Sequence, residues 1–354
     1  MLTKLTHRAI VVFTLISSLM AQGGGYALDF DGANDYVNTT YSGISGNNDR
    51  TVEAWVKTSA TGVNFITEWG VQQINQRFTV TVTSSKLRVE FAGGGLSGST
   101  NVNDGLWHHL VATHSSTSSP STKLYIDGNL EATASFTINT SSSGNVLVGK
   151  SAYWSEREFD GSIDEVRIWS VARTATQIAD NIHVLLDGDE TGLEAYYKMS
   201  DGSGTTVTDN SANSNSGTMV NMANSDWITS NAPIGVLTSG YTTDAEALWK
   251  GSGTSASDAS DGLTMVVGTA LTDANFAVFG NNNTAGTSTS DLPSGVEARS
   301  ARIWYLDESN TVAADVTIDI SDATGYTVTA GTASDYKLLN RAGTSGDFSI
   351  LASG

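Results

Sequence analysis

Apolar and polar residues alternate in many short runs along the chain, and clusters of Gly, Ser, Asn and Asp separate these runs. Alternation with a period of two is typical of strands that bury one face, and the clusters are typical of turns. The pattern therefore predicts an all-β protein made of short strands. In the first two thirds of the chain, the expected strands include residues 78–82, 87–91, 124–126, 145–148, 163–169, 193–199 and 218–220.

The segment 159–169 is expected to be a turn that leads into one of these strands. Gly161 supplies a turn position with positive φ, and the alternation follows it. We expect Val166 and Ile168 to face the core and their neighbours to face the other way. Asp164 is then a carboxylate at the entrance of the strand.

Residues 27–38 form a similar sequence, which predicts a strand, a glycine turn with carboxylates, and a second strand. Between it and residues 159–169 lie three further motifs, 51–57, 106–113 and 123–128. In this order, the five motifs resemble those of laminin G-like domains. These domains belong to the concanavalin A-like lectin/glucanase superfamily, here in its bacterial secreted form. The resemblance covers roughly residues 26–230 and includes a short helix-like segment after residue 174.

This resemblance implies a fold and a general role for residues 22–230. The family packs its strands as two antiparallel sheets in a jelly roll. Such modules serve cell adhesion or carbohydrate capture, so the implied partner is a polysaccharide or a cell-surface glycan or protein.

A change of composition near residues 231–235 predicts a domain boundary. The expected strands beyond it are 245–249, 263–267, 276–280, 301–306, 316–320 and 336–339. They predict a second, smaller β-sandwich over residues 236–354. This part is similar to a domain found beside laminin G-like units in large bacterial surface proteins. Because the sequence stops soon after the strand-like residues 348–351, we expect the second domain to be truncated and the chain to be a fragment.

Residues 1–21 have the features of a signal peptide. Lys4 and Arg8 precede the apolar run 9–20, which fits a signal core and is short for a membrane span. We expect cleavage near Ala21 and a secreted or cell-surface protein without membrane insertion. The alternative is a membrane anchor.

The charge and the cysteine content narrow the class of partner. The chain has 37 acidic and 18 basic residues and a formal net charge of −19. Such a surface repels nucleic acid and anionic lipid and favours cations. Because there is no Cys, stability must come from the core or from a bound metal rather than from disulfides.

Common catalytic motifs do not fit this sequence. Residues 93–98 match G-x-G-x-x-G, but no helix-like stretch comes after them, so we expect a flexible turn there. There is no G-x-S-x-G elbow or H-E-x-x-H motif. His108 and His109 would point to opposite faces of a strand, and we expect His109 to pack in the core.

A glycoside hydrolase needs two carboxylates that face each other across a cleft. The glucanases of the resembled superfamily carry them on one strand as Glu-x-Asp-x-x-Glu. Residues 158–163 approach that pattern, but Ile163 replaces the third acid and Gly161 interrupts the strand. We therefore expect no enzyme activity in this chain.

Aromatic residues beside amides or charges are candidates for stacking on sugar. Tyr153 and Trp154 lie in a polar segment, and Trp69 precedes a loop with Gln and Asn residues. The alternative is that each of these aromatic side chains packs at the rim or in the core. Three other tryptophans lie within strand motifs and are expected in the core: Trp55, Trp107 and Trp169.

Three carboxylates are candidate ligands of a structural calcium ion. Asp31 and Asp35 share one turn, and the resemblance implies that the strand with Asp164 is a neighbour and that this edge often holds calcium. Ca²⁺ takes oxygen ligands of this kind. The alternative is that Asp31 and Asp35 only shape the turn through side-chain to backbone hydrogen bonds.

Taken together, these features predict a secreted, non-catalytic binding module for carbohydrate or cell-surface adhesion. Two alternatives stay open at this point. The chain could be the ancillary, carbohydrate-binding part of a larger secreted glycoside hydrolase, or a structural spacer of a surface protein.

Overall fold

The structure, a computed structural model, describes residues 11–15, 25–237, 239–257, 262–294, 296, 298–310, 312–318, 337–341 and 345–353. It divides into two compact units. The first consists of residues 24–182 and 186–232, and the second of residues 183–185 and 233–354 with the N-terminal strand β1 (Val11–Leu15). Apart from β1, the expected signal peptide lies outside the described residues.

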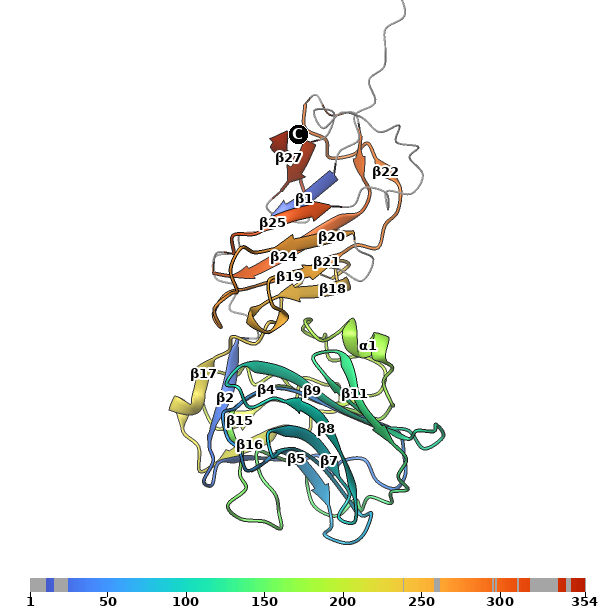
Figure 1. Cartoon of the computed structure of the whole chain (residues 1–354), viewed down its shortest axis with the longest axis vertical. Helices are drawn as coiled ribbons and strands as arrows, with labels where there is room; N and C mark the ends of the chain where they lie inside the picture. The colour runs from blue at the N-terminus through green and yellow to red at the C-terminus, as the bar shows by residue number, and fades with distance from the viewer. Residues whose placement is uncertain are drawn as a thin grey trace, which may run out of the picture. The chain divides into compact units, whose positions relative to one another are not determined.

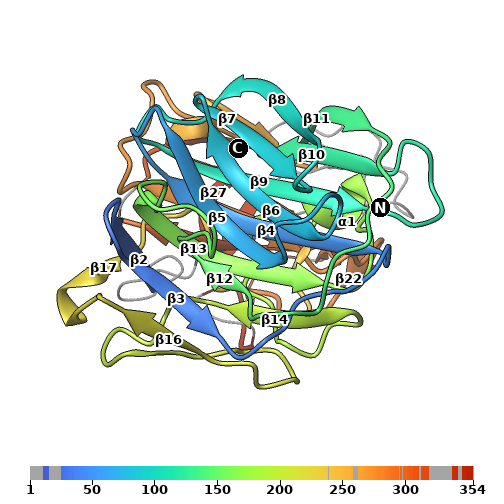
Figure 2. The same ribbon diagram turned by 90° about the horizontal axis from the view of Figure 1, so that it is seen from below.

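The first unit is a sandwich of two antiparallel sheets, which confirms the expected fold class (Figures 1 and 2). One sheet, which we call the β4 sheet, has the order β11-β10-β9-β4-β13-β2-β17, and β14 also pairs with β13. Its strands are β2 (Tyr26–Asp31), β4 (Arg50–Lys57), β9 (Trp107–His114), β10 (Thr122–Ile126), β11 (Asn129–Ala134), β13 (Asp160–Trp169), β14 (Leu193–Tyr197) and β17 (Trp227–Thr229).

The second layer, the β5 sheet, has the order β15-β16-β3-β12-β5-β6-β7-β8. Figure 1 shows β5 and β7 in a layer separate from β4 and β9. The strands of the β5 sheet are β3 (Tyr36–Thr39), β5 (Val63–Gly70), β6 (Arg77–Thr83), β7 (Lys86–Glu90), β8 (Gly95–Asn101), β12 (Leu147–Val148), β15 (Thr206–Val207) and β16 (Gly217–Val220).

The core lies between the two sheets and takes alternate residues from each strand, as the sequence pattern predicts. Examples are Val52, Ala54 and Val56 of β4 and Phe78, Val80 and Val82 of β6. All of these are at most 1% exposed. Burial of this kind is the main favourable term in folding, at about 25 cal/mol per Å² of apolar surface.

The central strand β13 begins earlier than the sequence indicates. Asp160 already pairs with Asp31 of β2, so Gly161 lies within the strand rather than in a turn before it. Gly161 has a φ of +131°, and a Cβ there would lie 2.2 Å from the carbonyl oxygen of Lys57. Only glycine allows the neighbouring strand to come this close.

A β-bulge in β13 explains why the alternation is interrupted at Asp164 and Glu165. The register with β4 shifts between Asp164 and Arg167, and Glu165 has a φ of +51°. A bulge inserts one extra residue and changes the face on which the residues after it lie. Asp164 is therefore inside the strand and fully buried, not at its entrance as expected. Val166 and Ile168 face the core, as predicted.

The outer face of the β4 sheet is also buried, because the chain after β13 returns to cover it. Helix α1 (Ala175–Ala179) places Ile178 against Val111 and Tyr125. Trp169 packs with a further group of apolar residues, Leu186, Leu193 and Tyr196. The burial of Trp55, Trp107, Trp169 and His109 (0–3% exposed) confirms the core positions expected for them.

This covered face contains a group of buried charges that the sequence pattern does not reveal. The Glu53 carboxylate lies 2.9 Å from the Arg173 guanidinium, 3.3 Å from His109 Nε2 and 3.9 Å from Arg167. Burial by itself would raise the pKa of Glu53, but these three groups outweigh it and lower the pKa to about 2. The carboxylate therefore stays ionised and serves as the common partner of three side chains.

The glycine-rich residues 93–98 are not wholly a turn, because Gly95–Asn101 form the edge strand β8. This segment lacks apolar alternation, so its pairing with β7 depends on the backbone rather than on a buried face. Two tight hairpins connect neighbouring strands: Ser84 and Ser85 join β6 to β7, and Asp127 and Gly128 join β10 to β11. Both residues of each pair have positive φ, as the tightest hairpin turns require.

The second unit is also made of short strands. Its largest sheet has the order β18-β21-β24-β1-β26-β27, in which β1 is parallel to both neighbours. Two smaller sheets are β19-β20-β25 and β22-β23. The strands are β18 (Thr243–Leu248), β19 (Ser255–Ser257), β20 (Leu263–Val266), β21 (Phe276–Asn281), β22 (Thr287–Ser288), β23 (Arg299–Ser300), β24 (Ile303–Ser309), β25 (Asp315–Ile318), β26 (Lys337–Asn340) and β27 (Ser349–Ser353).

Five of the six strands expected in this region overlap β18, β20, β21, β24 and β25, and the sixth overlaps β26. Residues 319–320 and 336 of the expected strands lie outside the described residues. Among the described residues, no helix has the length and apolar character needed to cross a membrane.

Candidate functional site

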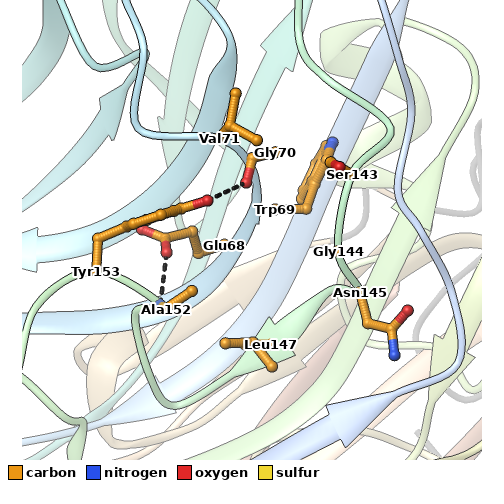
Figure 3. A pocket seen from close by; sticks show the side chains of 10 residues that line it. All are labelled: Glu68, Trp69, Gly70, Val71, Ser143, Gly144, Asn145, Leu147, Ala152 and Tyr153. Carbon is orange, nitrogen blue, oxygen red and sulfur yellow. Dashed lines mark hydrogen bonds between the residues drawn. The ribbon is translucent and has the colours of Figure 1, made fainter.

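A pocket of about 290 Å³ opens in the first unit beside the end of β5 (Figure 3). It is formed where the end of β5, the loop before β12 and the loop after β12 meet. The residues that line it are Glu68, Trp69, Gly70, Val71, Ser143, Gly144, Asn145, Leu147, Ala152 and Tyr153. The pocket is at the small end of the range for ligand sites.

Glu68 fixes the loop that forms one wall of the pocket. Its carboxylate accepts hydrogen bonds from the Ala152 N–H (2.8 Å) and from the Ser151 hydroxyl (2.8 and 3.0 Å). Arg77 is 3.4 Å away on the other side. Because Glu68 is only 1% exposed, burial raises its pKa, while these donors and Arg77 act in the opposite direction.

Tyr153 stands at the rim of the pocket with part of its ring open to solvent. Its hydroxyl donates a 3.0 Å hydrogen bond to the carbonyl of Gly70, and its backbone N–H donates to the Ser151 hydroxyl. The first bond, drawn in Figure 3, joins the ring to the end of β5, and the second holds the backbone of the loop. The side chain is still 42% exposed, so a ligand can contact the ring without displacing protein.

Trp154 is exposed but does not line the pocket. It is 39% exposed, and the Arg157 guanidinium lies 4.5 Å from the centre of its ring. A cation in this position is attracted to the ring face. The structure therefore places one of the two predicted loop aromatics in the pocket and the other outside it.

Trp69 lines the pocket, but almost all of its surface is in the core. It is 2% exposed, its ring stacks on Phe78 at 4.8 Å, and its Nε1–H donates to the carbonyl of Ile44. A ring packed in this way offers no face for a sugar. Its position agrees with the alternative of core packing.

Ser143 and Asn145 complete the site and were not recognised from the sequence. Both are exposed, and within the described residues their side chains have no hydrogen-bond partner. The hydroxyl and the amide can both donate and accept. A run of Ser, Gly and Asn before a strand indicates only a turn, so the sequence carries no signal for this role.

Asp31 and Asp35 lie together in the turn between β2 and β3. Asp31 Oδ1 accepts hydrogen bonds from the N–H groups of Ala33 (2.8 Å) and Asn34 (3.2 Å), and Asp35 Oδ2 accepts one from the Asp31 N–H (3.2 Å). The first of these bonds is the main reason why the pKa of Asp31 is lowered. Burial raises the pKa of Asp35. These contacts are the ones expected of residues that shape a turn.

Asp164 does not join these two carboxylates. Its strand pairs with β2 through Asp160, opposite Asp31, and Asp164 is four residues further along. At about 3.3 Å per residue, this separates the two by roughly 13 Å. Instead, Asp164 accepts a hydrogen bond from Ser230, and burial and the adjacent Glu165 raise its pKa well above the usual range. Among the described residues, no group of three or more His, Cys, Asp or Glu could hold a metal ion.

Comparison with known families agrees with this architecture. Residues 31–179 match the family model described as the concanavalin A-like lectin/glucanases superfamily. The first unit carries a concanavalin A-like domain. Residues 239–352, in the second unit, match a domain of unknown function, DUF8202. No curated protein matches the chain.

Three solved structures illustrate the range of similar proteins. A candidate carbohydrate-binding protein from Bacteroides ovatus has 23% identity and a TM-score of 0.49, over 60% of this chain and 62% of that one. The CBM40 of a Ruminococcus gnavus sialidase, bound to α2,3-sialyllactose, has 13% identity and a TM-score of 0.36, over 44% and 96%. Domain 4 of a GH43 extracellular arabinanase from Geobacillus stearothermophilus, bound to arabinotriose, has 21% identity and a TM-score of 0.35, over 44% and 75%.

Proposed function

We propose that the first unit is a non-catalytic glycan-binding module and that the pocket beside Tyr153 is its binding site. The observation that carries the proposal is an exposed aromatic ring beside two side chains, Ser143 and Asn145, that have no hydrogen-bond partner among the residues the structure describes. A sugar ring presents both an apolar face and hydroxyl groups. The match of residues 31–179 to the family model of the concanavalin A-like lectin/glucanases superfamily supports this class of ligand.

The composition of the pocket favours binding over hydrolysis. Hydrolysis of a glycosidic bond generally uses two carboxyl groups that face each other across the substrate. Of the residues that line the pocket, Glu68 alone is a carboxylate, and it is already engaged with Ser151, Ala152 and Arg77. An ancillary module of a larger hydrolase would bind glycan in the same way beside a separate catalytic domain, whereas a surface spacer would bind none.

The experiment is a glycan array probed with the full chain, followed by titration of the strongest ligand. We expect Tyr153→Ala to weaken binding at least tenfold, since the ring supplies the apolar contact. Trp154→Ala should have a smaller effect because Trp154 lies outside the pocket. Leu130→Ala serves as a control, as Leu130 is 57% exposed on the other sheet. Absence of any glycan ligand would favour the alternative of a structural spacer. Equal affinity of Tyr153→Ala and the parent chain would show that this pocket is not the binding site.

We also propose that the protein is exported, on the evidence of the basic start and short apolar run of residues 1–21. Cleavage after this segment would remove β1, so the mature chain would lack the strand that pairs with β24 and β26. Mass spectrometry of the mature protein should find an N-terminus close to residue 22. A mature chain that still begins with Met1 would contradict export by this route.

A further inference from the structure

We propose that the pocket takes one uncharged sugar unit and discriminates against acidic sugars such as uronic and sialic acids. This inference rests on the proposed glycan-binding function and adds the charge class and size of the ligand. The evidence is the set of charged groups around the pocket and what each of them already binds.

The pocket offers no positive charge to a ligand. Of its ten lining residues, all within the described part of the chain, none is Lys, Arg or His, and Glu68 is acidic. Moving a carboxylate out of water is costly unless a cation or several donors replace its hydration. An acidic sugar would therefore lose its hydration without gaining a charged partner.

Three cations near the residues that line the pocket are occupied by other groups. Arg77 is 1% exposed and lies between Glu68 (3.4 Å) and Glu90 (2.9 Å). The Lys150 ammonium lies over the ring of Tyr36 at 4.8 Å and 3.5 Å from Glu158. Arg157 lies over Trp154, outside the pocket lining.

The groups that are available suit neutral hydroxyls. The Ser143 hydroxyl and the Asn145 amide each donate and accept, as sugar hydroxyls also do. The Tyr153 ring lies on the opposite side of the pocket from Asn145 (Figure 3). The pocket volume of about 290 Å³ is at the small end of the range for ligand sites, which favours a single sugar ring over a longer segment.

The test compares oligosaccharides that differ only in the acid group, such as oligomers of galactose and of galacturonate, and of glucose and of glucuronate. The full chain should be titrated with each in about 0.5 M NaCl, where screening removes the general repulsion by its negative surface. We expect at least one neutral oligosaccharide to bind and its acidic counterpart to bind at least tenfold more weakly.

A matched pair of variants tests whether the pocket itself causes the discrimination. Asn145→Lys places a cation in the pocket wall and should improve binding of the acidic oligosaccharide at least fivefold. Ser142→Lys adds the same charge to an exposed residue of the same loop that does not line the pocket, and should not. If the glycan array finds no ligand of either charge class, the proposed function fails and this inference with it. Equal binding of both classes, or equal gains in the two variants, would overturn the inference while leaving glycan binding intact.

Discussion

At the scale of single residues, the sequence indicates what kind of ligand site to expect more reliably than it indicates which residues form the site. The exposed position of Tyr153 could be predicted because most residues of the segment around it are polar, which is typical of a surface loop. Trp69 was predicted as a sugar-stacking residue, but its ring is packed on Phe78, a contact that a local sequence pattern does not reveal. Asp164 was predicted at the entrance of its strand, but it lies at a β-bulge inside the strand, which the local pattern also does not reveal. Glu68 could not be predicted, since its partners Ser151 and Ala152 are 83 and 84 residues away in the sequence.

His108 makes a pH-dependent contribution to the stability of the fold. Its ring lies 2.8 Å from Asp127 and 3.2 Å from Asp104. Burial lowers the pKa of His108, but the hydrogen bond and charge of Asp127, aided by Asp104, outweigh burial and raise the pKa above its ordinary value. A histidine with a raised folded-state pKa stabilises the fold fully below the unfolded pKa, and this stability is lost as the pH rises through the folded value.

We therefore expect His108→Gln to lower the free energy of unfolding more at about pH 5.5 than at about pH 8.5, on either side of the ordinary histidine pKa of about 6.5. Urea denaturation of the parent and variant chains at both pH values gives the comparison. The difference between parent and variant isolates His108, because the other titrating groups are common to both. A loss of the same size at both pH values would show that the His108 charge contributes nothing.

At the scale of elements, alternation predicted the strands with one buried face and failed where backbone pairing alone defines the strand. Strand β13 shows a second limit, since both of its faces are buried and a bulge interrupts its period. The covering segment with α1 was expected as a short helix, but not as the partner of Glu53. The sequence shows that charges are present and cannot show that Arg173 reaches a strand 120 residues away.

One side chain of the β4 sheet forms hydrogen bonds with the edge strand β8. Glu131 of β11 accepts hydrogen bonds from the backbone N–H groups and the hydroxyls of Ser99 and Thr100. The bonds from Ser99 are the main reason why the pKa of Glu131 is lowered to about 2. The carboxylate therefore stays ionised and holds the two sheet edges together over most of the pH range.

Replacing Glu131 by Ala should loosen this edge. We expect amide hydrogen exchange at Ser99 and Thr100 to rise at least tenfold, because both N–H groups lose their acceptor. Thr133→Ala, at an exposed position of the same strand, is the control and should leave exchange unchanged. Unchanged rates in Glu131→Ala would mean that the backbone pairing of β8 with β7 is sufficient.

At the scale of the whole molecule, the order of motifs predicted the sandwich, and the composition predicted a second β-rich region. The calcium ion stays a prediction, now limited to the turn of Asp31 and Asp35. An ion that binds only the folded state at about 100 times its dissociation constant adds about 2.7 kcal/mol of stability. We expect calcium, compared with chelator, to raise the melting temperature, and Asp31→Asn to abolish the rise. Equal melting temperatures in both buffers would refute the ion.

Amide hydrogen exchange with the strongest array ligand can show whether the pocket beside Tyr153 binds a glycan. We expect slower exchange on ligand binding in residues 68–71, 143–147 and 151–153, and little change in the second unit. The same ligand should give no protection in Tyr153→Ala at the concentration that saturates the parent chain. Protection confined to other segments, with residues 68–71 and 151–153 unchanged, would show that the glycan binds elsewhere.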